Sequence, residues 1–110
     1  MDFKIEPCFD QENNTLSVTV EGEIDIFNST GFKDYLSNLV QEHACDIFID
    51  CTNLEYVDST GLGALVAVLK KVKQNGHNIH LLGLRPNILK LFRITNLDKV
   101  FVIEGDKYDN

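Results

Sequence analysis

The spacing of apolar residues divides the first third of the chain into two strands. Residues 3–9 are expected to form a short first strand, and Asn13-Asn14 marks the turn that follows it. Between residues 15 and 21, Leu and Val alternate with Thr, Ser and Glu, which is the two-residue period of a half-buried strand. We expect Gly22 to end this strand, and residues 23–27 to form a loop.

A helix and a third strand are expected next. Asn28, Ser29 and Thr30 are good helix N-caps, and the helix should end near Glu42 or His43. Its apolar residues recur at helical spacing and form one stripe: Phe32, Tyr35, Leu36, Leu39 and Val40. Residues 47–49 form a continuous apolar run, which predicts a strand covered on both faces.

Two more helices and two more strands are expected in the second half. The second helix carries the apolar residues Leu62, Leu65, Val66, Leu69 and Val72, and Gly76 is its natural stop. Residues 79–82 predict a strand, after which Pro86 can begin a short helix. The buried side of this helix would carry Ile88, Leu89, Leu91 and Phe92. Residues 100–103 predict the last strand, and residues 104–110 can form a turn at most.

The inferred order β-β-α-β-α-β-α-β predicts an α/β fold. Strands that alternate with helices favour a small, largely parallel sheet, and the first two strands add an antiparallel or mixed edge. A length of 110 residues is enough for one core and too short for two, so we expect a single domain over residues 1–110.

Composition and charge restrict the classes of partner. The net charge is −7, from 10 Lys and Arg against 17 Asp and Glu, which is unfavourable for nucleic acid. A basic protein partner fits this charge better. No apolar run approaches the ~20 residues of a membrane helix, and the first residues lack the order of a signal peptide. A cytoplasmic protein without membrane insertion is expected.

The cysteines and histidines show no motif. Cys8, Cys45 and Cys51 are far apart in the sequence, so neither a zinc site nor a redox pair is expected. Cys51 follows an apolar run and is predicted to pack as a small apolar residue. The histidines are His43, His77 and His80, and their spacing does not indicate metal ligation.

The most informative stretch is Asp58-Ser59-Thr60-Gly61-Leu62-Gly63, between a predicted strand and a predicted helix. The first N–H groups of a helix have no partner within the helix, and this end carries partial positive charge that favours an added phosphate. From the residues alone, Ser59 is either part of a helix cap or a site of modification.

Four known motifs of catalytic or phosphate-binding sites do not fit this stretch. A serine hydrolase elbow needs a glycine at position 57, which is Val. A phosphate-binding loop needs a lysine after its second glycine, and a dinucleotide fingerprint needs a third glycine where Val66 stands. A receiver-type phosphate site needs an acidic pair after the first strand, which is missing. No enzyme is expected.

Several stretches together resemble the anti-sigma factor antagonist family, which has the STAS fold. These are Gly22-Glu23-Ile24-Asp25, residues 47–50 and 56–63, and then residues 73–76, 81–84, 88–92 and 95–101. The similarity runs from Leu16 to Ile103.

The resemblance implies a function for the central stretch. Members of this family bind an anti-sigma factor that is also a serine/threonine kinase, and so free a sigma factor for transcription. The kinase phosphorylates the serine after the aspartate, which here is Ser59, and a phosphatase reverses this. ATP would belong to the kinase, so no cofactor is expected in this chain. The implied partner-binding residues are Asp25, Asp58, Ser59, Thr60, Gly61, Leu62 and Gly63.

Two other functions stay open at this point. The chain could be a STAS subunit of another assembly, such as a stress-sensing or lipid-transport complex, without kinase regulation. A small hydrolase with Ser59 as the nucleophile is the third hypothesis.

Overall fold

The computed structural model of the chain describes residues 3–105, which form a five-stranded sheet and three α-helices. The strands are β1 (Phe3–Asp10), β2 (Thr15–Ile24), β3 (Asp46–Val57), β4 (Ile79–Leu82) and β5 (Val102–Glu104). The helices are α1 (Ser29–Glu42), α2 (Ser59–Gln74) and α3 (Pro86–Ile94), and a 3-10 helix, η1 (Leu97–Lys99), follows them. The predicted order of strands and α-helices is confirmed, and η1 is an addition to it.

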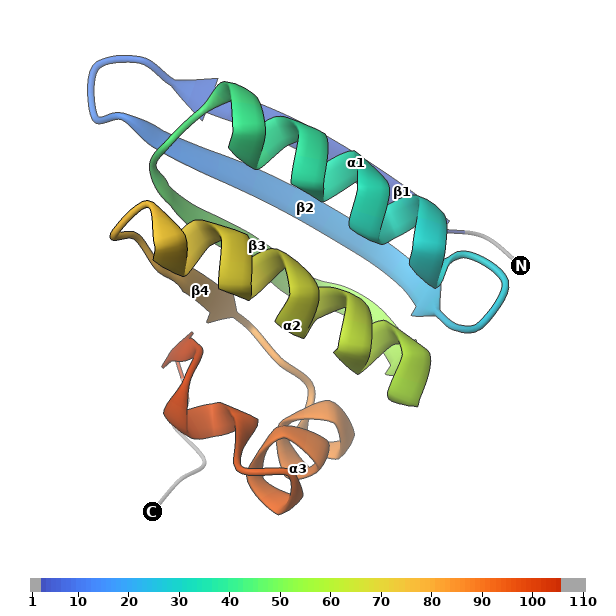
Figure 1. Ribbon diagram of the computed structural model, residues 1–110. Helices are drawn as coiled ribbons and strands as arrows, with labels where there is room; N and C mark the ends of the chain where they lie inside the picture. The colour runs from blue at the N-terminus through green and yellow to red at the C-terminus, as the bar shows by residue number, and fades with distance from the viewer. Residues whose placement is uncertain (1–2, 106–110) are drawn as a thin grey trace.

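The strands are arranged in the sheet in the order of the sequence. β1 pairs with β2 in antiparallel fashion, and the pairs β2–β3, β3–β4 and β4–β5 are parallel. The mixed, largely parallel sheet is therefore confirmed. Figure 1 shows α1 and α2 lying side by side across one face of the sheet, with α3 beyond α2.

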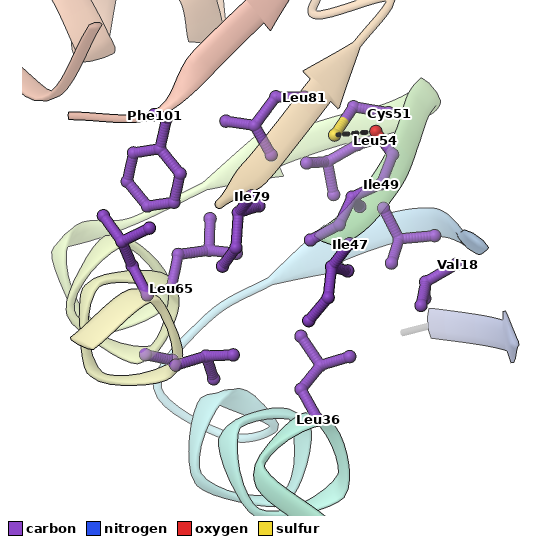
Figure 2. Packing of buried hydrophobic residues seen from close by; sticks show 14 of the residues in the cluster. Val18, Leu36, Ile47, Ile49, Cys51, Leu54, Leu65, Ile79, Leu81 and Phe101 are labelled. Carbon is purple, nitrogen blue, oxygen red and sulfur yellow. Dashed lines mark hydrogen bonds between the residues drawn. The ribbon is translucent and has the colours of Figure 1, made fainter. Parts of the chain in front are cut away.

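The hydrophobic core lies between this face and the helices. Figure 2 shows Val18 of β2, Ile49 of β3 and Leu81 of β4 in one cluster that also contains Leu36 of α1 and Leu65 of α2. All five are almost completely buried. Burial of each such side chain stabilises the fold by about 1.5–3 kcal/mol. Cys51 lies in the same layer, where burial raises the pKa of its thiol to about 12, so its prediction as a packing residue is confirmed.

The prediction that residues 47–49 are covered on both faces is wrong. Ile47 and Ile49 point into the core, whereas Phe48 is only half-buried on the opposite face. Ser17 of β2 and Asp50 of β3 are exposed on that same face. The apolar run reflects the stacking of Phe48 on the His80 ring, whose centroid lies 4.2 Å away, and not a second layer of helices.

Gly22 does not end the second strand. β2 continues to Ile24, and its pairing with β3 shifts register between Thr19 and Glu21 and again between Gly22 and Glu23. Gly22 adopts a φ of 99°, which a glycine accepts without strain, so the strand bends here and continues. β3 also continues beyond the predicted run, to Val57. Because its pairing with β2 is irregular here, buried and exposed residues no longer alternate, and the second half of the strand could not be recognised from the sequence.

The end of the chain also differs from the prediction. Val100 and Phe101 precede the last strand, because Asn96 takes a left-handed conformation that leads into η1. Phe101 instead packs edge-on against Phe92 of α3, with ring centroids 5.5 Å apart. The turn expected over residues 104–110 lies mostly outside the described residues.

Candidate functional site

Asp58 is the N-cap residue of α2. It has an extended backbone between β3 and the helix, and its Oδ1 accepts a hydrogen bond from the Gly61 N–H at 3.0 Å. The same oxygen accepts the Thr60 hydroxyl at 2.5 Å. The cap is therefore Asp58, and the Ser59 side chain is not needed for this role.

The same carboxylate joins the helix to the loop between β2 and α1. Oδ2 of Asp58 accepts the N–H of Ile26 at 3.1 Å, and the Asp58 N–H donates to the Ile24 carbonyl at 3.1 Å. The hydrogen bonds from the Thr60 hydroxyl and the Gly61 N–H hold the pKa of Asp58 below its usual range. An ionised carboxylate thus lies one residue before Ser59.

Ser59 is the first residue of α2 and is exposed. It lies at the positive end of a 16-residue helix, where backbone N–H groups point toward solvent. An enzyme can reach this hydroxyl without any rearrangement of the core. The charge balance at this position is mixed, because the helix end attracts an anion and Asp58 repels one.

Asp25 is brought to the same edge of the sheet, but its carboxylate is turned into its own loop. Only 7% of the residue is exposed. Oδ1 of Asp25 accepts the N–H of Phe27 at 2.9 Å, and the Asp25 N–H donates to Oδ1 of Asn28 at 2.9 Å. The contact between this loop and Asp58 is made by the backbone of Ile26. Asp25 therefore stabilises the conformation of its own loop through these hydrogen bonds.

The four residues after Ser59 fall on two sides of α2. Gly61 and Leu62 face the sheet and are buried, whereas Thr60 is half-buried and Gly63 is exposed. A Cβ on Gly61 would lie 2.7 Å from Cγ1 of Val57, so the helix can approach the sheet only with glycine here. A Cβ on Gly63 would meet no atom within 4 Å. Of the predicted partner-binding residues, Gly61 and Leu62 are therefore buried between α2 and the sheet and are not exposed to a partner.

Two exposed apolar residues at this edge are not among the site residues expected from the sequence. Ile26 and Phe27 are 66% and 91% exposed, and they lie in the loop that Asp58 holds. Beside Ile26 is a shallow depression of about 340 Å³ between α1 and α2. It is lined by Ile26, Thr30 and Lys33 on one side and by Thr60, Gly63 and Ala67 on the other. In the sequence, Ile26 and Phe27 stand out only as an apolar pair that fits neither the pattern of the preceding strand nor the apolar stripe of the following helix.

His77 and His80 lie at the opposite end of β3 from Ser59. Asp46, the first residue of β3, contacts Nδ1 of His77 at 3.1 Å and Nε2 of His80 at 3.0 Å. The other ring nitrogen of His80 contacts Glu104 at 2.5 Å. The structure thus supplies no histidine base to Ser59 among these two, which removes the basis of the hydrolase hypothesis. Within residues 3–105, no cluster of His, Cys, Asp and Glu is arranged to hold a metal ion.

Comparisons with known proteins agree with this architecture. An anti-sigma-B factor antagonist from Staphylococcus epidermidis is 38% identical over 93 residues, which is 84% of this chain and 86% of that protein. An anti-sigma factor antagonist from Mycobacterium paratuberculosis has a TM-score of 0.73 at 24% identity, and covers 96% of this chain and 90% of its own. The phosphorylated form of Bacillus SpoIIAA has a TM-score of 0.70 at 18% identity, with coverage of 97% and 95%. These two structures have the same fold.

Among the helices of residues 3–105, none has the length and apolar character needed to cross a membrane. The family model of the STAS domain matches residues 7–109, which is nearly the whole chain. Together with the relative from Staphylococcus epidermidis, this match shows that the chain belongs to the anti-sigma factor antagonists of the STAS domain family.

Proposed function

We propose that this protein binds an anti-sigma factor with serine/threonine kinase activity, frees a sigma factor for transcription, and is inactivated when Ser59 is phosphorylated. The observation that carries the proposal is the position of Ser59. Its hydroxyl is exposed at the first residue of α2, and the helix is capped by Asp58 instead. A hydroxyl without a structural task can gain a phosphate without loss of the fold.

The related proteins support this role. The relative from Staphylococcus epidermidis is named an anti-sigma-B factor antagonist, and Bacillus SpoIIAA has been described in a phosphorylated form. Asp58, Ser59 and Gly63 lie on the accessible side of this edge, where a protein partner would dock. A phosphatase acting on Ser59 would restore the active form.

The electrostatics at Ser59 explain why phosphorylation would act as a switch. Phosphoserine carries about −1.5 to −2 charge near pH 7. The N-terminus of α2 favours this charge within the isolated protein. In a complex the same group must be buried beside the carboxylate of Asp58, whose low pKa keeps it ionised. The complex is expected to dissociate while the domain stays folded.

The direct test is a phosphorylation assay with the purified anti-sigma factor of the same organism and ATP. Mass spectrometry of the intact protein and its peptides should find one phosphate, on Ser59. Ser59→Ala should block it, whereas Ser17→Ala, which removes another exposed serine on the sheet, should not. Phosphate on a different residue would contradict the proposal.

The binding assay gives the second half of the test. Ser59→Ala should retain affinity for the anti-sigma factor, and Ser59→Asp should weaken it by at least tenfold through added negative charge. Both variants should melt within about 2 °C of the wild type, because surface substitutions away from structural features change stability by less than ~0.5 kcal/mol. Tight binding without any phosphorylation would instead favour a STAS subunit in an assembly without a kinase.

A further inference from the structure

The loop between β2 and α1 presents its apolar side chains to solvent in a fixed position. Phe27 is 91% exposed and Ile26 is 66% exposed, and Phe27 is the most exposed large apolar residue of the described chain. A side chain of this size would normally be withdrawn from water, because apolar surface costs free energy when it is hydrated. Two adjacent apolar side chains are thus exposed in one loop, and they form an apolar surface that is available to a protein partner.

Hydrogen bonds hold this loop from both sides. The Phe27 N–H donates to the Asp25 carboxylate at 2.9 Å, and the Ile26 N–H donates to the Asp58 carboxylate at 3.1 Å. Nδ2 of Asn28 donates a hydrogen bond to the carbonyl oxygen of Glu23 at 2.8 Å, which joins the two ends of the loop. The backbone is thus ordered before binding, so a partner that receives these side chains does not have to order the loop.

The surroundings of the pair leave room for a second protein. The depression beside Ile26 is lined by small side chains on α2, among them Gly63 and Ala67. Gly63 has open space where a Cβ would be. A partner can therefore approach closely here and enclose the exposed apolar side chains, which is the setting in which hot-spot residues contribute most to affinity.

From this geometry we infer that Ile26 and Phe27 are the apolar anchor of the complex, and that they insert into a hydrophobic pocket of the anti-sigma factor. The inference rests on the proposed function, and it adds the residues that supply most of the affinity. The anti-sigma factor is the occupant because the anchor is continuous with Ser59: Asp58 bonds the backbone of Ile26 and caps the helix that Ser59 begins. Phosphorylation would then act at the edge of an interface whose centre is apolar.

The test is a binding titration of the purified anti-sigma factor of the same organism with four forms of this protein: wild type, Phe27→Ala, Ile26→Ala and Ile94→Ala. The last is a matched control, because Ile94 is an isoleucine with 67% exposure at the end of α3. We expect Phe27→Ala to raise the Kd by about 30-fold and Ile26→Ala by about tenfold, as for hot-spot residues. Ile94→Ala should stay within twofold of the wild type.

Melting curves separate binding from folding in the same variants. Because both anchors are exposed, Phe27→Ala and Ile26→Ala should keep the wild-type melting temperature, and Phe27→Leu should recover most of the affinity. Wild-type binding with unchanged affinity in Phe27→Ala would overturn the inference while leaving the proposed function intact. Failure of the wild type to bind would instead contradict the proposed function.

Sedimentation of the protein alone tests a second copy as the alternative occupant. If the anti-sigma factor is the occupant, we expect the same sedimentation coefficient for wild type and Phe27→Ala across a range of concentrations. A wild-type dimer that Phe27→Ala dissociates would assign the anchor to self-association and would overturn the inference.

Discussion

At the residue scale, one carboxylate of Asp58 holds both the start of α2 and the loop before α1. Its Oδ1 caps α2 through Gly61, and its Oδ2 holds the backbone of Ile26. Because one carboxylate satisfies the helix end, the neighbouring hydroxyl of Ser59 is left accessible. The helix cap and the proposed modification site therefore lie on adjacent residues.

Asp58→Asn tests the contribution of the charge to the cap. Hydrogen bonds lower the pKa of Asp58, so its stabilisation is present above the usual pKa of about 4 and is lost as the pH falls through the lowered value. We expect the wild type to melt several degrees above Asp58→Asn at pH 7. The difference should shrink toward zero near pH 2. Thermal melts across this range measure it, and a constant difference would show that the charge is not responsible.

At the element scale, α2 has two glycines with opposite requirements. Gly61 faces the sheet, where a Cβ would lie 3.0 Å from the Ile24 carbonyl oxygen as well as against Val57. Gly63 faces outward, where a Cβ has open space. One glycine sets the distance between helix and sheet, and the other leaves part of the proposed binding surface flat.

The same substitution at the two glycines should therefore have effects of opposite sign. Gly61→Ala should lower the free energy of unfolding by about 1–3 kcal/mol through overpacking. Gly63→Ala should raise it by about 0.5–1 kcal/mol, since alanine loses less backbone freedom in a helix. Denaturant unfolding of both variants measures the difference. Equal effects at the two positions would contradict the assigned orientations.

At the scale of the whole molecule, the proposed binding surface and one set of stabilising contacts lie at opposite ends of the sheet. Ser59 lies two residues after the end of β3, whereas Asp46 begins this strand and contacts His77 and His80 beside it. Burial alone would raise the pKa of Asp46, but hydrogen bonds from His80, the Asn78 N–H and His77 outweigh burial and lower it. This cluster connects β3 to β4 and, through Glu104, to β5.

Asp46→Asn should therefore separate stability from binding. Partial exposure weakens these charged hydrogen bonds, so we expect a loss of about 1 kcal/mol in the free energy of unfolding at pH 7. The Kd for the anti-sigma factor should stay within twofold of the wild type, because the site is at the other end of a 12-residue strand. Unfolding and binding titrations measure the two effects, and a large change in Kd at constant stability would contradict this separation.

Local pattern determined the order of the strands and α-helices, the ends of α1 and the position of the stretch from Asp58 to Gly63. These features depend on residue type and on spacing within a few turns, which a sequence displays directly. The bulged halves of β2 and β3 escaped recognition because irregular pairing breaks the two-residue period. The resemblance to the family rested on these local motifs, and the match over residues 7–109 confirms it.

Tertiary structure alone decided which side chains the site presents. Parallel pairing of Ile24 with Val57 brings the loop after β2 against the start of α2, so that Asp58 can bond Ile26 across 32 positions of sequence. The same packing turns the Asp25 carboxylate inward, buries Leu62 and leaves Phe27 in solvent. These outcomes depend on contacts between segments that are far apart in the sequence. Such contacts cannot be recognised from residue type and local spacing.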